Sequence, residues 1–169
     1  PNRLERAKAE IRDMLPALSE HRVGLLAFAG RSSVLSPLTS DHGFFRLALD
    51  SANVGSVNLG GTSIGDALQK GVDLLKDQEG PKAILLISDG EDHDSYPLEA
   101  AEAARHAGVS IIAVGFGSEE GTNIEVLDPS TGAKKKIVDS NGKEVLSRLD
   151  GETLRKVALA TNGVYIPAA

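Results

Sequence analysis

The sequence predicts an α/β protein in which a mostly parallel sheet lies between helices. Three nearly continuous apolar runs carry this prediction, at residues 23–29, 82–88 and 110–117. Such runs are typical of strands that are covered on both faces. Stretches with apolar residues at helical spacing alternate with them, and this alternation implies right-handed crossovers between parallel strands. We therefore expect helices on both faces of the sheet.

The N-terminal part of the chain is expected to hold a helix, two strands and a second helix. The first helix is predicted over residues 3–19, and Pro16 predicts a kink or an early end because proline lacks the backbone donor. A short strand over 34–38 contains a proline, which places it at an edge of the sheet. Asp41 is expected to cap a helix that continues to about Ala52.

The second half of the chain continues the alternation and then interrupts it. Helices are expected over 64–76, 97–107 and 150–160, and a last short strand over 163–166. Residues 122–147 hold three short β-like runs, 124–127, 134–138 and 144–146, separated by turn sequences. We expect a small antiparallel β-hairpin insertion within a single domain that covers residues 1–169. Its lysines, 134–136, predict a solvated edge strand, with a contact patch as the alternative.

Composition sets limits on the partners of the protein. The chain has 169 residues, a formal net charge of -6 and a pI near 5.2, which argues against nucleic acid or an anionic membrane as the main partner. It contains no apolar run of the roughly 20 residues that span a bilayer. The absence of cysteine excludes disulfides, thiolate metal sites and cysteine nucleophiles.

Two loops contain candidate ligands for a hard cation. Residues 60–68 indicate a glycine turn that presents Thr62 and Ser63 and then begins a helix. The apolar run at 82–88 ends in Asp89, which lies beside a glycine. Hydroxyl and carboxylate oxygens are the ligands that magnesium and calcium prefer. Thr62 and Asp89 are therefore the candidate metal ligands.

Structural roles are the alternatives for the same residues. Thr62 or Ser63 can cap the helix that follows, and Asp89 can be a strand-end carboxylate bonded to the backbone. Next to Asp89, the acidic loop of Glu91, Asp92 and Asp94 predicts a solvated rim, with a calcium site as the alternative, although its spacing does not fit an EF-hand. The histidines do not have zinc-binding spacing.

The ordered set of these features resembles the von Willebrand factor A (vWA) domain, a Rossmann-like, doubly wound α/β fold. Within that family the resemblance is to bacterial membrane-anchored proteins of the aerotolerance (Bat) type. Three local sequences support it: Phe28–Gly30 followed by Pro37–Asp41, Gly61–Ala67, and Ser88–Asp92. The insertion that precedes Leu149–Leu154 also looks like that subgroup. The likeness covers nearly the whole chain.

The resemblance implies a metal-ion-dependent adhesion site (MIDAS) built from three loops. Thr62 matches the threonine of the second loop and Asp89 the aspartate of the third, but the DxSxS sequence of the first loop is missing. The chain begins at Pro1, where the first helix should start, so the family's central first strand is missing as well. We therefore expect an N-terminally incomplete domain, with a gap between strands 23–29 and 82–88. A strand from a second copy, a partner chain or a rearranged terminus is expected to fill it.

Two functions remain open at this stage. The resemblance implies a protein-binding module in which a divalent cation, Mg²⁺ or alternatively Ca²⁺ or Mn²⁺, is completed by a carboxylate of the partner. It also implies a MoxR-type AAA+ ATPase or other vWA proteins as partners, and a membrane-anchored bacterial protein. The alternative is a metal-assisted phosphohydrolase on the same scaffold. A phosphohydrolase would need a nucleophile or a general base from the acidic loop 89–94. We expect the chain not to be an enzyme.

Overall fold

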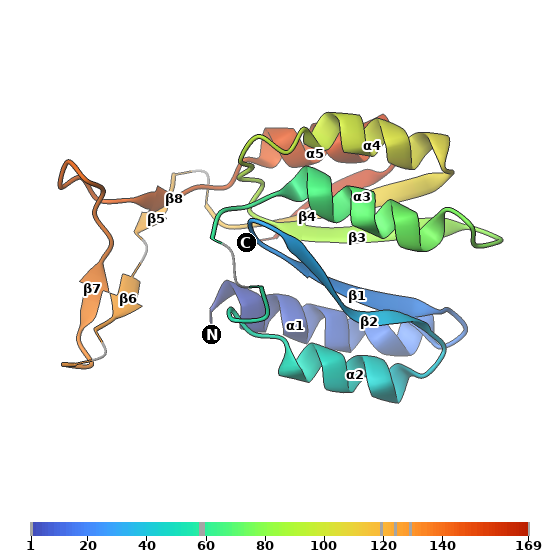
Figure 1. Ribbon diagram of the computed structural model, residues 1–169, viewed down its shortest axis with the longest axis horizontal. Helices are drawn as coiled ribbons and strands as arrows, with labels where there is room; N and C mark the ends of the chain where they lie inside the picture. The colour runs from blue at the N-terminus through green and yellow to red at the C-terminus, as the bar shows by residue number, and fades with distance from the viewer. Residues whose placement is uncertain (1, 58–59, 119, 124, 129, 169) are drawn as a thin grey trace.

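The computed structural model describes residues 2–57, 60–118, 120–123, 125–128 and 130–168 (Figure 1). The helices are α1 (Arg3–Met14), the 3₁₀ helix η1 (Leu15–Leu18), α2 (His42–Ser51), α3 (Ile64–Leu75), α4 (Pro97–His106) and α5 (Gly151–Ala160). The strands are β1 (Val23–Phe28), β2 (Ser32–Thr39), β3 (Lys82–Ser88), β4 (Val109–Phe116), β5 (Thr122–Asn123), β6 (Glu125–Leu127), β7 (Lys134–Lys136), β8 (Leu146–Ser147) and β9 (Val164–Ala168). The predicted alternation of strands and helices is confirmed.

The strands of the α/β body form two separate sheets. β3, β4 and β9 form a parallel sheet in that order, and β1 pairs with β2 in an antiparallel hairpin. Helices α3, α4 and α5 cover one face of the parallel sheet, and α1 and α2 lie on the other side of the molecule beside the hairpin (Figure 1). The chain therefore has the predicted layers of helices around a sheet.

The predicted gap in the sheet is present. Among the described residues, β1 pairs only with β2 and β3 pairs only with β4, so the two strands are not paired with each other. The prediction that both strands are covered on both faces is wrong. β1 contains no buried residue, and in β3 only Leu86 is buried, whereas β4 is mostly buried. A strand with one unpaired edge lacks the neighbour that would shield it.

Two clusters of apolar side chains hold the body together. The larger lies between the parallel sheet and helices α3, α4 and α5, and it includes Leu68, Ile111 and Leu154, each at most 1% exposed. The smaller joins η1 to α2 through Leu15, Phe45 and Leu49. The larger cluster includes Leu86 of β3 and Val109, Ile111 and Ala113 of β4, so it anchors the strands that lead to the candidate site.

The predicted ends of the first two helices are confirmed. α1 ends at Met14, and the segment with Pro16 continues as the 3₁₀ helix η1, because a proline cannot donate to the preceding turn. At the start of α2, Asp41 Oδ1 accepts a hydrogen bond of 3.0 Å from the Phe44 amide. This is the cap that the sequence predicts.

The insertion over residues 122–147 projects away from the body (Figure 1). It is built from two short antiparallel pairs, β5 with β8 and β6 with β7. All three residues of its lysine strand β7 are exposed, in agreement with a solvated strand. The first predicted run begins at Ile124, which lies outside the described residues, as does Pro1. Among the described helices, none combines the length and the apolar composition of a membrane span.

Candidate metal site

Asp89 is the first residue after β3 and lies at the carboxyl end of the parallel sheet. Its side chain is 23% exposed. Oδ2 accepts a hydrogen bond of 3.2 Å from Arg3 Nη1 and one of 3.3 Å from Ser147 Oγ, and Oδ1 accepts one of 3.3 Å from the Glu91 amide. Both oxygens of the predicted metal ligand therefore have partners within the chain.

Arg3 and Ser147 complete this cluster from distant parts of the sequence. Arg3 comes from the first turn of α1 and Ser147 from β8 at the base of the insertion. Arg3 Nη1 donates to Ser147 Oγ over 2.6 Å, and the guanidinium lies close to Gly117 at the end of β4. Ser147 is buried, with 8% of its surface exposed. Sequence reasoning missed both residues because no local pattern links them to Asp89.

Opposing effects act on the pKa of the Asp89 carboxyl. Burial raises the pKa of Asp89 above its ordinary value, because desolvation penalises the charged carboxylate, and the nearby Glu91 charge acts in the same direction. The Glu91 amide, the Arg3 charge and the Ser147 hydroxyl lower the pKa. The net direction is upward. A nearby cation favours the carboxylate form, and Arg3 already supplies one positive charge.

Thr62 lies in the loop that leads into α3, and this loop is bonded to the loop after Asp89. The His93 amide donates to the Thr62 carbonyl over 2.8 Å, and the Thr62 amide donates to His93 Nδ1 over 3.0 Å. The structure therefore joins the two loops that the sequence predicts to share a site. The role of Thr62 and Asp89 as metal ligands stays a prediction.

The alternative in which the Ser63 side chain caps α3 is wrong. Ser63 stands at the N-cap position of α3, but its Oγ makes no capping bond and donates to the Gly30 carbonyl over 3.2 Å. The Ile64 amide donates to Asp92 Oδ1 over 2.9 Å, and the Gly65 amide donates to Ser95 Oγ over 2.7 Å. Side chains from another loop therefore satisfy the free amides of α3, and Thr62 and Ser63 are not needed as caps.

The acidic loop is a structural connector and not only a solvated rim. Asp92 also accepts a hydrogen bond of 3.0 Å from the Ser95 amide, and Ser95 Oγ donates to the same carboxylate. Glu91 Oε1 accepts a bond of 3.1 Å from the Arg148 amide at the base of the insertion. Of the three acidic side chains, Asp94 alone matches the predicted exposed rim.

Two glycines make the close approach of these loops possible. A Cβ at Gly65 would lie 1.8 Å from the Ser95 carbonyl oxygen. Gly90 has a φ of +81°, and a Cβ there would lie 2.2 Å from the Asp150 carbonyl oxygen. Any larger residue would push the loop after β3 away from α3 or α5. Gly65 in the first turn of α3 and Gly90 next to Asp89 are therefore required by packing.

The donor atoms fit a hard cation in type. Asp89 supplies carboxylate oxygens, and Thr62 and Ser147 carry hydroxyls. Magnesium is commonly bound through one or two carboxylates and keeps several waters. Among the described residues there is no group of three or more His, Cys, Asp or Glu side chains that could hold a metal ion. A cation here would therefore rely on one carboxylate and would have to share it with Arg3.

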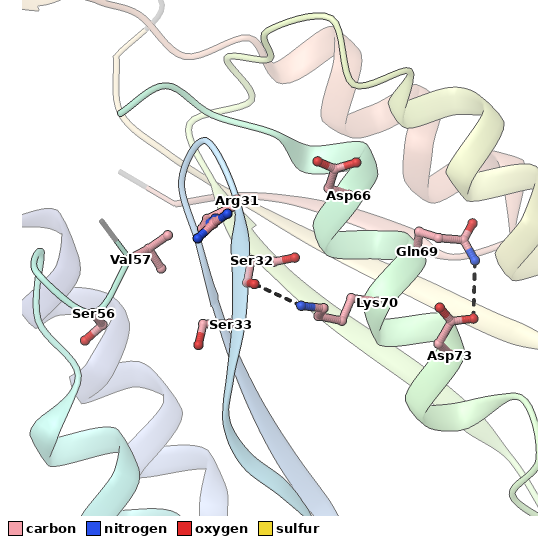
Figure 2. A pocket seen from close by; sticks show the side chains of 9 residues that line it. All are labelled: Arg31, Ser32, Ser33, Ser56, Val57, Asp66, Gln69, Lys70 and Asp73. Carbon is pink, nitrogen blue, oxygen red and sulfur yellow. Dashed lines mark hydrogen bonds between the residues drawn. The ribbon is translucent and has the colours of Figure 1, made fainter. Parts of the chain in front are cut away.

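A polar cavity of 620 Å³ lies between α3, the start of β2 and the loop after α2 (Figure 2). It was not predicted from the sequence. It is lined by Arg31, Ser32, Ser33, Ser56, Val57, Asp66, Gln69, Lys70 and Asp73. The Lys70 side chain extends across part of the cavity, and its Nζ donates to the Ser32 carbonyl over 3.0 Å. Three separate segments build the cavity, so no sequence motif marks it. Its charges are mixed, and they favour no single class of ligand.

Comparison with known families decides the identity of the fold. The model of the von Willebrand factor type A domain matches residues 1–149. The chain belongs to this family. Its fold is the vWA fold that the resemblance predicts, with a parallel sheet, flanking helices and small antiparallel pairs in the insertion.

Two solved bacterial structures are closely similar to this vWA domain. One is described as the conserved hypothetical protein BatB from Bacteroides thetaiotaomicron, with 32% identity, a TM-score of 0.90, and 99% of this chain and 80% of that chain covered. The other is an aerotolerance-related membrane protein from Bacteroides fragilis, with 29% identity, a TM-score of 0.90, and 100% and 82% of the two chains covered. The predicted likeness to Bat-type proteins is confirmed.

One curated relative is a longer protein than this chain. An uncharacterized protein of Borreliella burgdorferi is 30% identical over 168 residues, which are 97% of this chain and 47% of the relative. The chain thus spans about half the length of that relative. A mussel byssus protein with a zinc-occupied MIDAS motif, 17% identical, has a TM-score of 0.63 over 94% of this chain and 36% of its own. At that identity the likeness concerns the fold.

Proposed function

We propose that this vWA domain is a cation-dependent protein-binding module. Asp89 and Thr62 would hold a divalent cation, with Mg²⁺ as the expected ion and Ca²⁺ or Mn²⁺ as alternatives. A carboxylate from a partner protein would complete the coordination. The cation would supply the local charge and the geometry for recognition.

One observation carries this proposal. The half-buried carboxylate of Asp89 lies at the carboxyl end of a parallel strand. The loop that carries Thr62 is hydrogen-bonded to the loop that follows Asp89. The carboxyl ends of parallel strands are the usual place for binding sites in open α/β sheets. The zinc-occupied MIDAS motif described for the byssus protein gives further support for a cation site in this fold.

The partner is proposed from the Bat-type resemblance. We propose a MoxR-type AAA+ ATPase or another vWA protein, and a setting in a membrane-associated bacterial protein. The description of the Bacteroides fragilis protein as an aerotolerance-related membrane protein supports this setting. The protruding insertion, whose base lies at Asp89, would give such a partner additional surface near the cation.

A catalytic role has less support from the site. A phosphohydrolase would need a nucleophile or a general base from residues 89–94. Asp92 is occupied by the amides of Ile64 and Ser95, and Glu91 accepts a bond from the Arg148 amide. Asp89 itself is bonded to Arg3 and Ser147. These side chains hold loops together, so we favour binding over catalysis.

The gap in the sheet supports a further part of the proposal. β1 and β3 each have one edge with no strand partner among the described residues. Backbone donors and acceptors at such edges pair readily with another strand. We propose that an extended strand of a second copy of this chain fills this place under conditions where the chain is studied alone.

Binding of Mn²⁺ tests the cation site. Electron paramagnetic resonance of Mn²⁺ titrated with protein should show binding by the unmodified chain and loss of binding in D89A, with T62V weakened. D77A removes an exposed carboxylate in the loop after α3 and should bind like the unmodified chain. Equal binding by D89A and D77A would contradict the proposal. The same variants, with and without EDTA, should then be tested against a purified MoxR-type ATPase.

A further inference from the structure

We infer that Arg3 determines the cation affinity of the Asp89 site because its guanidinium and a divalent cation compete for the same carboxylate. The inference rests on the proposed function. It concerns Arg3, a residue that is not one of the proposed cation ligands.

The guanidinium already occupies the cation-binding side of Asp89. Arg3 Nη1 lies 3.2 Å from Asp89 Oδ2 and 2.6 Å from Ser147 Oγ. Ser147 Oγ lies 3.3 Å from the same carboxylate oxygen, so the three groups form a closed triangle. The guanidinium also lies close to Gly117, since a Cβ at that position would be in van der Waals contact with Arg3 Cζ, at 3.7 Å.

Simultaneous binding of the Arg3 guanidinium and a divalent cation to Asp89 is unfavourable on two grounds. Oδ1 accepts from the Glu91 amide, so Oδ2 is the oxygen that Arg3 and an incoming cation would both use. A divalent cation at Oδ2 would also lie next to the positive guanidinium, and like charges at such a separation repel. Binding of the cation therefore requires Arg3 to leave Asp89.

The exchange has a consequence for the fold around the site. Arg3 is in the first turn of α1, and Ser147 is at the base of the insertion. Their contacts tie both elements to the end of β3. When a cation replaces the guanidinium, the tie between α1 and Asp89 is broken, while Ser147 keeps a hydroxyl next to the carboxylate. Binding of the cation would therefore change the environment of the Arg3 side chain.

Mn²⁺ affinity of R3Q measures the competition. R3Q removes the charge and keeps a side chain that can bond to Ser147. R12Q is the matched control, since Arg12 is also on α1 but pairs with Asp50, over 2.6 Å. Partly exposed ion pairs are worth a modest free energy, so we expect R3Q to bind Mn²⁺ roughly two- to fivefold more tightly than the unmodified chain. R12Q should bind like the unmodified chain.

A second readout separates competition from a structural effect of the substitution. In ¹⁵N-resolved NMR spectra, the Arg3 Nε–Hε signal should shift when Mg²⁺ is added to the unmodified chain, and it should not shift in D89A. Equal affinity of R3Q and the unmodified chain, with an unchanged Arg3 signal, would overturn the inference and leave the cation site standing. Failure of both proteins to bind Mn²⁺ would overturn the proposed function and the inference together. Thermal melting confirms that each variant is folded.

Discussion

Asp92, in the loop after β3, accepts a hydrogen bond of 2.9 Å from the amide of Ile64, the first residue of α3. The two residues are 28 positions apart, and the contact joins the two loops of the candidate metal site. A carboxylate at the N-terminus of a helix also interacts favourably with the helix dipole. The cap of α3 is therefore supplied by the neighbouring loop.

Removal of this cap should destabilise the protein. We expect D92A to lower the free energy of unfolding by about 0.5–2 kcal/mol, the usual cost of losing an N-cap carboxylate. Urea unfolding followed by circular dichroism measures the difference. D77A removes a carboxylate from an exposed position at the other end of α3 and should change stability little. A D92A protein as stable as D77A would show that the bond to Ile64 contributes nothing.

Gly65 should tolerate no side chain. The substitution G65A places a Cβ 1.8 Å from the Ser95 carbonyl oxygen, so we expect a loss of about 1–3 kcal/mol or more from overpacking. G71A, in the same helix, meets only the flexible end of Ile84 at 2.9 Å. There the gain in helix propensity offsets the contact, and stability should stay nearly unchanged. Thermal melting of the pair measures the contrast, and equal losses would contradict the packing argument.

Lys8 is a buried residue with a structural task. Its Nζ donates to the carbonyls of Asp50 and Ala52, each at 3.0 Å, at the end of α2. K8A would leave the buried Ala52 carbonyl without this donor, which costs about 1–3 kcal/mol. K156A removes a lysine whose pair with Glu152 is well exposed, and it should cost less than about 1 kcal/mol. Chemical denaturation of both variants measures the difference, and K8A should be clearly the less stable.

The titration of Asp89 should respond to Arg3. The Arg3 charge lowers a pKa that burial raises, so R3Q should raise the pKa of Asp89 further. Between the ordinary pKa of aspartate and the raised one, the folded protein keeps a proton that the unfolded chain has lost. The stability contributed by this group is therefore present at low pH and is lost as pH rises through that window. Carboxyl ¹³C NMR measures the pKa, and a lower value in R3Q would refute this account. R12Q should leave it unchanged.

The unpaired strand edges should cause self-association. Leu85 lies in β3 and is 36% exposed. A lysine there would place a charge where another strand has to pack, so L85K should weaken any association that sedimentation velocity detects at rising concentration. V54K changes a residue that is 86% exposed, in the loop after α2, and should associate like the unmodified chain. A chain that stays monomeric at all concentrations would contradict the proposed filling of the gap by a second copy.

Much of the fold could be predicted because it depends on local pattern. Apolar runs of strand length and stripes at helical spacing indicated β1, β3, β4 and the major helices. Asp41 indicated the start of α2, and Pro16 indicated the end of α1, because a cap and a break depend on neighbours in the chain. The gap between β1 and β3 was expected from the resemblance alone.

The sequence by itself determined the order of elements, the family and the two candidate ligands, Thr62 and Asp89. The tertiary structure decided what surrounds them: Asp92 caps α3, and Arg3 pairs with Asp89 across 86 positions of the chain. Contacts of this range arise only when packing brings the ends of strands and helices together. The carboxylate of Asp89, which the sequence predicts as a metal ligand, is thus already paired with the guanidinium of Arg3 in the folded chain.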